Sequence, residues 1–197
     1  AAIAHDLRTP LTRLRFRAEQ APDMLRDRMA DDIEEMDALI AQAMRYVRGE
    51  QAAERRERFD LAALARDVTD GFIETGSRAV FQSGGSLEVE ADPAALRRAL
   101  GNLVDNALSF GGTVRVAASC DDGVALIVVE DDGPGLPEDQ LEAVFEPFAR
   151  GERSRNRETG GAGLGLTVAR QAARAHGGDV VLANRDGGGL SARLWLP

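Results

Sequence analysis

A histidine with an acid beside it lies near the start of the chain, in the run AHDLRTPLTR over residues 4–13. On a helix, His5 stands two positions from both Ile3 and Leu7, so its ring points away from the apolar stripe that those two residues begin. Neutral imidazole is nucleophilic near pH 7, and Asp6 can hold one ring proton and raise the basicity of the other nitrogen. The pattern predicts an exposed, reactive His5, with an ordinary surface histidine as the alternative.

Two more residues of the same run favour a reactive turn. Thr9 lies one helical turn from His5 and shares its face. Pro10 removes a helical amide and invites a bend just below that turn. The second histidine of the chain, His176, precedes two glycines at the end of a predicted helix, where capping explains it. We therefore expect chemistry at His5 and not at His176.

Two asparagines four residues apart, Asn102 and Asn106, share one face of a predicted helix. Amide oxygens can ligate a hard divalent cation such as magnesium, which prefers oxygen donors. The pattern is consistent with a magnesium site, and an exposed polar helix face is the alternative.

An acidic turn, EDDGPG over residues 130–135, follows an apolar strand. A strand that ends in an acid before Gly-Pro-Gly places a carboxylate at the edge of the sheet, with free space beside the main chain. Such a carboxylate can accept hydrogen bonds from an exocyclic amine. The alternative is an ordinary turn, because Asp, Gly and Pro are all turn formers.

A glycine-rich run, GGAGLGL over residues 160–166, leads into a predicted helix. Glycines allow close approach of the main chain, and a helix N-terminus offers free amides and a positive dipole to phosphate. The run lacks the Gly-Lys-Ser/Thr ending of a Walker loop and does not match the dinucleotide fingerprint. Alone, the glycine-rich run is weak evidence for a binding site. Together with the asparagine pair and the acidic turn before it, the run predicts a nucleotide site.

The composition limits the other functions. The chain has 197 residues, 44% of them hydrophobic but only 5% aromatic, and 24 basic against 33 acidic residues give a net charge of −9. This balance argues against non-specific binding of nucleic acid. All of the basic residues are arginine, so any phosphate contact must come from arginine, a main-chain amide or a metal. The single Cys120 excludes an internal disulfide and fits a reducing compartment.

Helical periodicity covers the first 50 residues, which we expect to form a helical hairpin broken near Ala21-Pro22-Asp23. Two helices alone cannot bury both apolar stripes, so we expect a dimer that forms a four-helix bundle. Residues 51–58 have no apolar face and are predicted to be a linker.

The second region, residues 59–197, alternates helices and strands. Asp92-Pro93 predicts the start of a long helix over about 94–109, and a second helix is predicted over 164–175. Strands are predicted at SLEVEA, TVRVAAS, VALIVVED, VVLA and LSARLWL. The expected fold class is α+β: the helical hairpin followed by a mixed sheet with helices on one face, a two-layer α/β sandwich.

These motifs together resemble those of sensor histidine kinases. NLVDN, DDGPG, VFEPF and GAGLGL follow the order of that family's N, G1, F and G2 boxes, and AHDLRTPLTR is similar to its H box. The resemblance covers practically the whole chain. HDLRTPLTR, EDDGPG, PFARG and GLSARLWLP are similar to the EnvZ-type osmosensor branch.

The resemblance implies a Bergerat-type ATP-binding domain behind a dimeric hairpin. His5 would take the γ-phosphate of ATP with Asp6 as base or orienter, and Thr9 would position water when phosphate is removed from a partner regulator. Asn106 would hold magnesium, with Asn102 nearby. The rest of the implied site comprises Asp131 on the adenine amine, with Gly133 and Gly135 shaping that end; Phe110 against adenine; Gly161, Gly163, Leu164 and Gly165 along the triphosphate; and Phe145 and Phe148 as anchors of a lid.

One position departs from the family pattern. Many relatives carry Lys or Arg shortly after the second asparagine, where this chain has Ser109. The missing charge would have to come from Arg150 or Arg153, since guanidinium binds phosphate strongly.

The resemblance further implies a response-regulator receiver domain as partner and a homodimer. It also implies a cytoplasmic fragment of an inner-membrane sensor protein whose membrane segment lies upstream. Two other readings stay open: an ATPase of the same nucleotide-binding superfamily that forms no phosphohistidine, and a degenerate ATP-binding scaffold.

Overall fold

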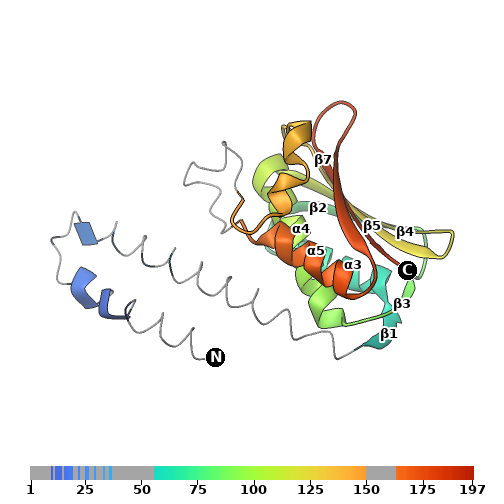
Figure 1. Ribbon diagram of the computed structural model, residues 1–197, viewed down its shortest axis with the longest axis horizontal. Coiled ribbons are helices and arrows are strands. Elements are labelled where there is room, and N and C mark those ends of the chain that lie inside the picture. Colours follow the sequence, from blue (N-terminus) through green and yellow to red (C-terminus); the bar gives the residue numbers. More distant parts are fainter. Residues whose placement is uncertain are drawn as a thin grey trace.

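The computed structural model describes residues 56–149 and 163–197, together with single residues and short runs between positions 10 and 36. The helices and strands of the two long ranges follow one another along the chain (Figure 1). They are β1 (Glu57–Asp60), α3 (Leu61–Glu74), β2 (Arg78–Ser83), β3 (Glu88–Ala91), α4 (Pro93–Gly111), β4 (Thr113–Asp121), β5 (Val124–Asp131), the short 3-10 helices η1 (Glu138–Gln140) and η2 (Ala143–Phe145), α5 (Gly165–Ala175), β6 (Asp179–Asn184) and β7 (Leu190–Leu196).

Five strands form one mixed sheet in the order β2-β4-β5-β7-β6. The β2–β4 pair is parallel and the other three pairs are antiparallel. The helices α3, α4 and α5 cover one face of this sheet (Figure 1). The structure thus confirms the predicted two-layer α/β sandwich.

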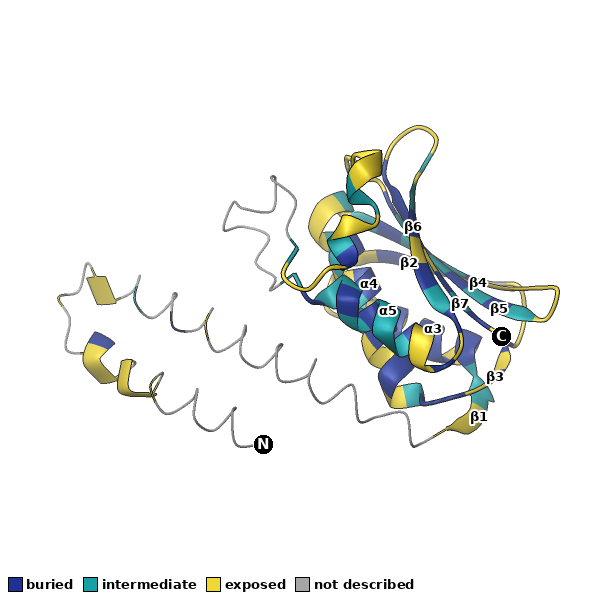
Figure 2. Ribbon diagram, in the orientation of Figure 1, coloured by how far each residue is buried: buried dark blue, intermediate teal, exposed yellow. Residues whose placement is uncertain are grey.

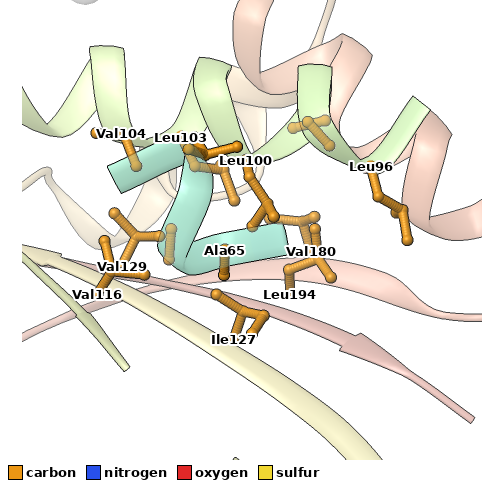
Figure 3. Close-up of a cluster of buried hydrophobic side chains, with 14 of the residues drawn as sticks. Ala65, Leu96, Leu100, Leu103, Val104, Val116, Ile127, Val129, Val180 and Leu194 are labelled. Carbon is orange, nitrogen blue, oxygen red and sulfur yellow. The ribbon is translucent and has the colours of Figure 1, made fainter. Parts of the chain in front are cut away.

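The hydrophobic core lies between the sheet and these helices (Figures 2 and 3). In β5 every second residue is buried, which is the period expected of a strand with one covered face. Leu96, Leu100 and Leu103 of α4 are at most 1% exposed and pack against this face. Because aliphatic side chains fill the whole layer, α4 and α5 are fixed relative to the end of β5.

The long helix α4 begins where the sequence predicts. Asp92 caps it by accepting hydrogen bonds from the amides of Ala94 (2.8 Å) and Ala95 (3.1 Å), and Pro93 takes the first helical position. The helix ends at Gly112, whose φ of 69° is the left-handed conformation that glycine adopts readily. Its observed length exceeds the predicted range by one residue at the start and two at the end.

Two strands were not predicted. β1 pairs antiparallel with β3 in a separate two-stranded sheet, and it begins at Glu57, inside the segment predicted as linker. β2 pairs with β4 at the edge of the main sheet. Neither segment shows a clear alternation of apolar and polar residues. Each becomes a strand by pairing with a segment that is distant in the sequence.

In the amino-terminal region the structure describes too few residues to trace a hairpin, and Asp23 of the predicted break lies outside them. Ala18 and Ile33 are buried against each other there, with Met29 packed beside them. Ala18 belongs to the first predicted apolar stripe, and the other two residues belong to the second.

Candidate nucleotide-binding site

The first asparagine of α4 contacts the start of α5. The Asn102 side-chain amide donates a hydrogen bond to the Gly165 carbonyl oxygen (3.2 Å), which joins the two helices. Asn106 is half-buried, one turn further on. Within the part of the chain that the structure describes, its side chain makes no hydrogen bond. An amide oxygen left free in a half-buried position is available to a ligand or a metal ion.

Asp131 is the last residue of β5 and is only 4% exposed. Its Oδ1 accepts hydrogen bonds from the amides of Gly133 (2.7 Å) and Leu190 (3.2 Å). Burial raises the pKa of the Asp131 carboxyl, and the two amides and the charge of Arg185 partly offset that rise. No hydrogen bond to Oδ2 is found among the described residues, so this oxygen is available to an amine.

Close packing brings the end of α4 against the acidic turn. A Cβ atom at Gly111 would lie 2.5 Å from Cβ of Asp131, and one at Gly133 would lie 2.9 Å from the Phe110 carbonyl oxygen. Only glycine allows these approaches. The Phe110 side chain beside them is 41% exposed. The helix α4 therefore contacts the acidic turn at its end and the start of α5 through Asn102.

The glycine-rich run joins the start of α5 to the η2 segment. Gly163 has a φ of 68°, its carbonyl accepts a hydrogen bond from the Phe148 amide (3.1 Å), and a Cβ there would lie 2.7 Å from the Ala149 carbonyl oxygen. The Leu164 side chain is completely buried, so that only its main chain can face a ligand. Gly165 is the first residue of α5, where the main-chain amides have no partner within the helix.

The two phenylalanines of VFEPF differ in burial. Phe145 is 7% exposed and lies under the Arg170 guanidinium, which is 4.2 Å from the ring centroid. The Thr167 hydroxyl donates to the Phe145 carbonyl oxygen (2.8 Å). Phe148 is 65% exposed and has a φ of 65°, which is uncommon for a bulky residue. Phe145 is therefore fixed to α5, whereas the Phe148 side chain is not packed in the core.

Arg170 is a residue that the sequence analysis missed. It forms ion pairs with Glu142 and, through Nε at 2.8 Å, with Oδ1 of Asp179. Burial alone would raise the pKa of Asp179, but hydrogen bonds from Arg170, Arg174 and the Val180 amide lower it to about 2. These contacts fix α5 to the start of β6 and to the segment that carries Phe145.

His176 joins the two long helices. Its Nε2 accepts a hydrogen bond from the Asp92 amide (3.0 Å), and its Nδ1 lies 2.7 Å from the Ala172 carbonyl oxygen. Both contacts fit the neutral tautomer with the proton on Nδ1. The ring is 6% exposed and closes the end of α5. The predicted structural role of His176 therefore extends to the start of α4.

Several predicted site residues lie outside the described residues: His5, Asp6, Thr9, Arg150, Arg153 and Gly161. Their roles stay predictions.

Gly135 lies close to a further residue that the sequence analysis missed. A Cβ at Gly135 would lie 2.6 Å from Oδ1 of Asn184, the last residue of β6. Arg185, the next residue, contacts the main chain of Asp131. Nothing was predicted from the run RDGGGL that follows Asn184.

Within residues 56–149, 163–197 and the described positions before them, no helix is long and apolar enough to cross a membrane. The same residues hold no cluster of three or more His, Cys, Asp or Glu side chains that could bind a metal. The metal ligand that the sequence predicts is instead the amide of Asn106.

Comparisons with known proteins bear on the whole site. Residues 91–197 match the family described as histidine kinase-, DNA gyrase B-, and HSP90-like ATPase. The chain is 40% identical to the sensor histidine kinase GtrS of Pseudomonas aeruginosa over 201 residues, covering all of this chain and 41% of that protein. It spans less than half the length of the curated relatives it matches.

Solved structures agree with this match. Full-length ShkA in complex with AMPPNP is 27% identical, with a TM-score of 0.75 over all of this chain and 45% of that one. The histidine kinase domain of the Escherichia coli osmosensor EnvZ is 34% identical, with a TM-score of 0.56 over 72% of this chain and 88% of that one. The chain therefore belongs to the family of histidine kinase-, DNA gyrase B- and HSP90-like ATPases, as the catalytic region of a sensor histidine kinase.

Proposed function

We propose that the chain binds ATP with magnesium, transfers the γ-phosphate to His5, and passes it to an aspartate of a response-regulator receiver domain. Removal of phosphate from that regulator, with Thr9 positioning the water, belongs to the same proposal. One observation supports the nucleotide part: α4 contacts the acidic turn at its end and the start of α5 through Asn102, and among the described residues Oδ2 of Asp131 and the Asn106 amide have no partner.

In this proposal each end of the site recognises a different part of the nucleotide. Oδ2 of Asp131 accepts a hydrogen bond from the adenine amine, and Gly133 and Gly135 leave room for the base, with Phe110 beside it. Asn106 holds magnesium, which neutralises charge on the triphosphate when bound. The amides at Gly163, Leu164 and Gly165 donate to phosphate oxygens, as helix N-termini commonly do.

The proposed chemistry takes place at His5. A neutral ring nitrogen attacks the γ-phosphorus, the bond from that phosphorus to the bridging oxygen breaks, and ADP leaves. Asp6 holds the other ring nitrogen through its proton. Because Ser109 carries no charge, we assign the cation that neutralises the γ-phosphate to Arg150, with Arg153 as the other candidate.

The proposed homodimer has support in the amino-terminal region. Leu14, Phe16, Leu25 and Met36 are between 36% and 64% exposed in the single chain. Contact with a second hairpin would remove this apolar surface from water. We assign residues 1–50 to the dimerisation and phosphotransfer hairpin, 51–58 to the linker, and 59–197 to the catalytic domain. Because β1 begins at Glu57, the last two residues of the assigned linker are the first two residues of that strand.

The proposal also places the chain in a longer sensor protein. Its curated relatives are about twice as long, and they bear the names of sensors. We therefore propose a cytoplasmic location for this region, with the membrane segment of an inner-membrane protein upstream. The stimulus lies with the part of the protein that is not in this chain.

Labelling with γ-labelled ATP and magnesium tests the phosphorylation directly. The chain has two histidines, and His176 is buried with both ring nitrogens in hydrogen bonds, so label on histidine should map to His5. We expect acid-labile, base-stable label on the wild-type chain and none on His5→Gln, with ATP affinity unchanged. Histidine label that survives His5→Gln would remove His5 from this role.

The same assay separates the two alternatives. A superfamily ATPase would release inorganic phosphate at the same rate in the wild-type chain and in His5→Gln, with no labelled protein. A degenerate scaffold would bind ATP and neither release nor transfer phosphate.

A further inference from the structure

The turn between β6 and β7 contacts the acidic turn at several points. A Cβ at Gly189 would lie 2.0 Å from the Asp131 carbonyl oxygen, so this turn approaches Asp131 as closely as a main chain can. The Leu190 amide donates to Oδ1 of Asp131 (3.2 Å). Residues 185–190 thus lie directly against the acid proposed to bind adenine, although they are more than fifty residues away in the sequence.

Arg185 bridges three consecutive residues at the end of β5. Its Nη1 donates to the main-chain oxygen of Asp131 (2.6 Å) and to Oδ1 of Asp132 (3.0 Å), and its Nε lies 3.5 Å from Oε2 of Glu130. The side chain is 22% exposed. Arg115 on β4 holds the same two carboxylates, with its Nη2 2.6 Å from Asp132 and its Nε 3.8 Å from Glu130. The Asp131 main chain is therefore held by Arg185, and the carboxylates on both sides of it pair with Arg185 and Arg115.

Asn184 holds the other end of the acidic turn. Its Oδ1 accepts from the Leu136 amide (2.9 Å), and its Nδ2 donates to the Leu136 carbonyl oxygen (2.7 Å). Two adjacent residues, Asn184 and Arg185, thus fix the main chain at Leu136 and at Asp131. The acidic turn between these two points therefore has little freedom to move, and the Asp131 carboxylate has little freedom to reorient.

We infer that Arg185 is a positioning residue for base recognition: it holds the Asp131 main chain so that the free carboxylate oxygen keeps one orientation toward the adenine amine. This rests on the proposed function. Arginine suits the role because its planar guanidinium binds several acceptors at fixed angles, whereas lysine offers one compact charge. The opposing view is that Arg185 only adds surface ion pairs, which contribute little to stability.

The test compares two nucleotides that differ at the base. Inosine diphosphate carries an oxygen in place of the adenine amine, so it cannot make the contact that Asp131 accepts. Affinities of the 197-residue chain for ADP and inosine diphosphate, with magnesium, are measured by calorimetry for the wild type and for Arg185→Gln, Arg185→Lys and Asp131→Asn. Arg97→Gln is the matched control, because Arg97 near the start of α4 pairs with Asp67 of α3 (3.4 Å) and both side chains are exposed.

We expect Arg185→Gln to weaken ADP binding roughly tenfold, the size of coupling usual between contacting residues, and to leave inosine diphosphate binding unchanged. The ADP affinity of Arg185→Lys should lie between those of the wild type and Arg185→Gln. This second variant keeps the test valid if the glutamine variant fails to fold. Adding Arg185→Gln to Asp131→Asn should weaken ADP binding no further. Arg97→Gln should change neither affinity.

Two results would overturn the inference: equal weakening of both nucleotides by the folded Arg185 variants, or no change in ADP binding by either variant. Failure of the proposed function looks different. In that case Asp131→Asn itself would leave ADP binding intact, or the wild-type chain would bind neither nucleotide.

Discussion

The proposed base end and the proposed phosphate end of the site are held in different ways. At the base end, Asp131 already makes its protein contacts: two amides fix Oδ1, and Arg185 fixes its main chain. At the phosphate end, the Asn106 side chain makes no hydrogen bond to the described residues. The base end is thus preorganised on folding, whereas the phosphate end depends on its ligand to satisfy its polar groups.

This difference predicts opposite consequences for substitutions at the two ends. A change at the phosphate end should remove function and spare stability. A change at the base end should affect stability and base selectivity together.

Asn106→Ala should have the largest effect on function. It removes the proposed magnesium ligand and should lower phosphorylation by at least roughly a hundredfold, the upper range for lost partners of metal ligands. The unfolding temperature should stay within about 2 °C of the wild type, because the side chain has no described hydrogen bond to lose. Phosphorylation and thermal unfolding are measured on the same preparation. If Asn106→Ala unfolded at a clearly lower temperature but was phosphorylated normally, the proposed difference between the two ends would be wrong.

Gly189→Ala should be the most destabilising change at the base end. Gly189 has a φ of 94°, and the added methyl group would lie 2.0 Å from the Asp131 carbonyl oxygen. The expected loss in free energy of unfolding is about 2 to 3 kcal/mol, from backbone strain and overpacking. Denaturant unfolding measures it.

Gly71→Ala is the control for that substitution, since Gly71 lies within α3 with nothing within 4 Å of the added atom. It should stabilise the helix by about 0.5 to 1 kcal/mol. Equal effects at the two glycines would show that the close approach of residue 189 to Asp131 does not exist.

Acid should weaken the ion pairs by which Asp179 holds α5, the helix whose start forms the proposed phosphate end. The pKa of Asp179 is lowered to about 2, and a lowered carboxyl pKa stabilises the fold above the ordinary value near 4. That stabilisation, about 2 kcal/mol, should be lost as the pH falls from about 4 to 2. Asp179→Asn should remove this pH dependence, as followed by denaturant unfolding at each pH.

Asp67→Asn is the comparison for the acid experiment, because its ion pair with Arg97 is exposed and should contribute less than about 0.5 kcal/mol. An acid profile that Asp179→Asn leaves unaltered would mean that Arg170 and Arg174 do not fix α5 through this carboxylate.

The local features of the fold were predictable from sequence. Asp92-Pro93 starts α4, and alternation in TVRVAAS and VALIVVED gives β4 and β5, because capping and strand periodicity depend on neighbouring residues. β1 was missed because ERFD carries mostly charge and becomes a strand only through pairing with β3, about thirty residues away.

The candidate site divides in the same way. Asn102, Asn106 and the glycines were indicated by spacing within one motif each. Arg170 and Arg185 were not, because their partners are contributed by other elements and an arginine alone carries no signal of what it will contact.

The central claim is that a nucleotide lies between α4, the acidic turn and the start of α5. NMR of the labelled chain, titrated with ADP and magnesium, tests it most directly. We predict the largest shifts at the Asn106 side-chain amide, the Gly133 amide and the Leu190 amide, and little change at Val80 and Val181, which are exposed on β2 and β6. Shifts confined to those two strands, with Asn106 and Gly133 unchanged, would contradict the account.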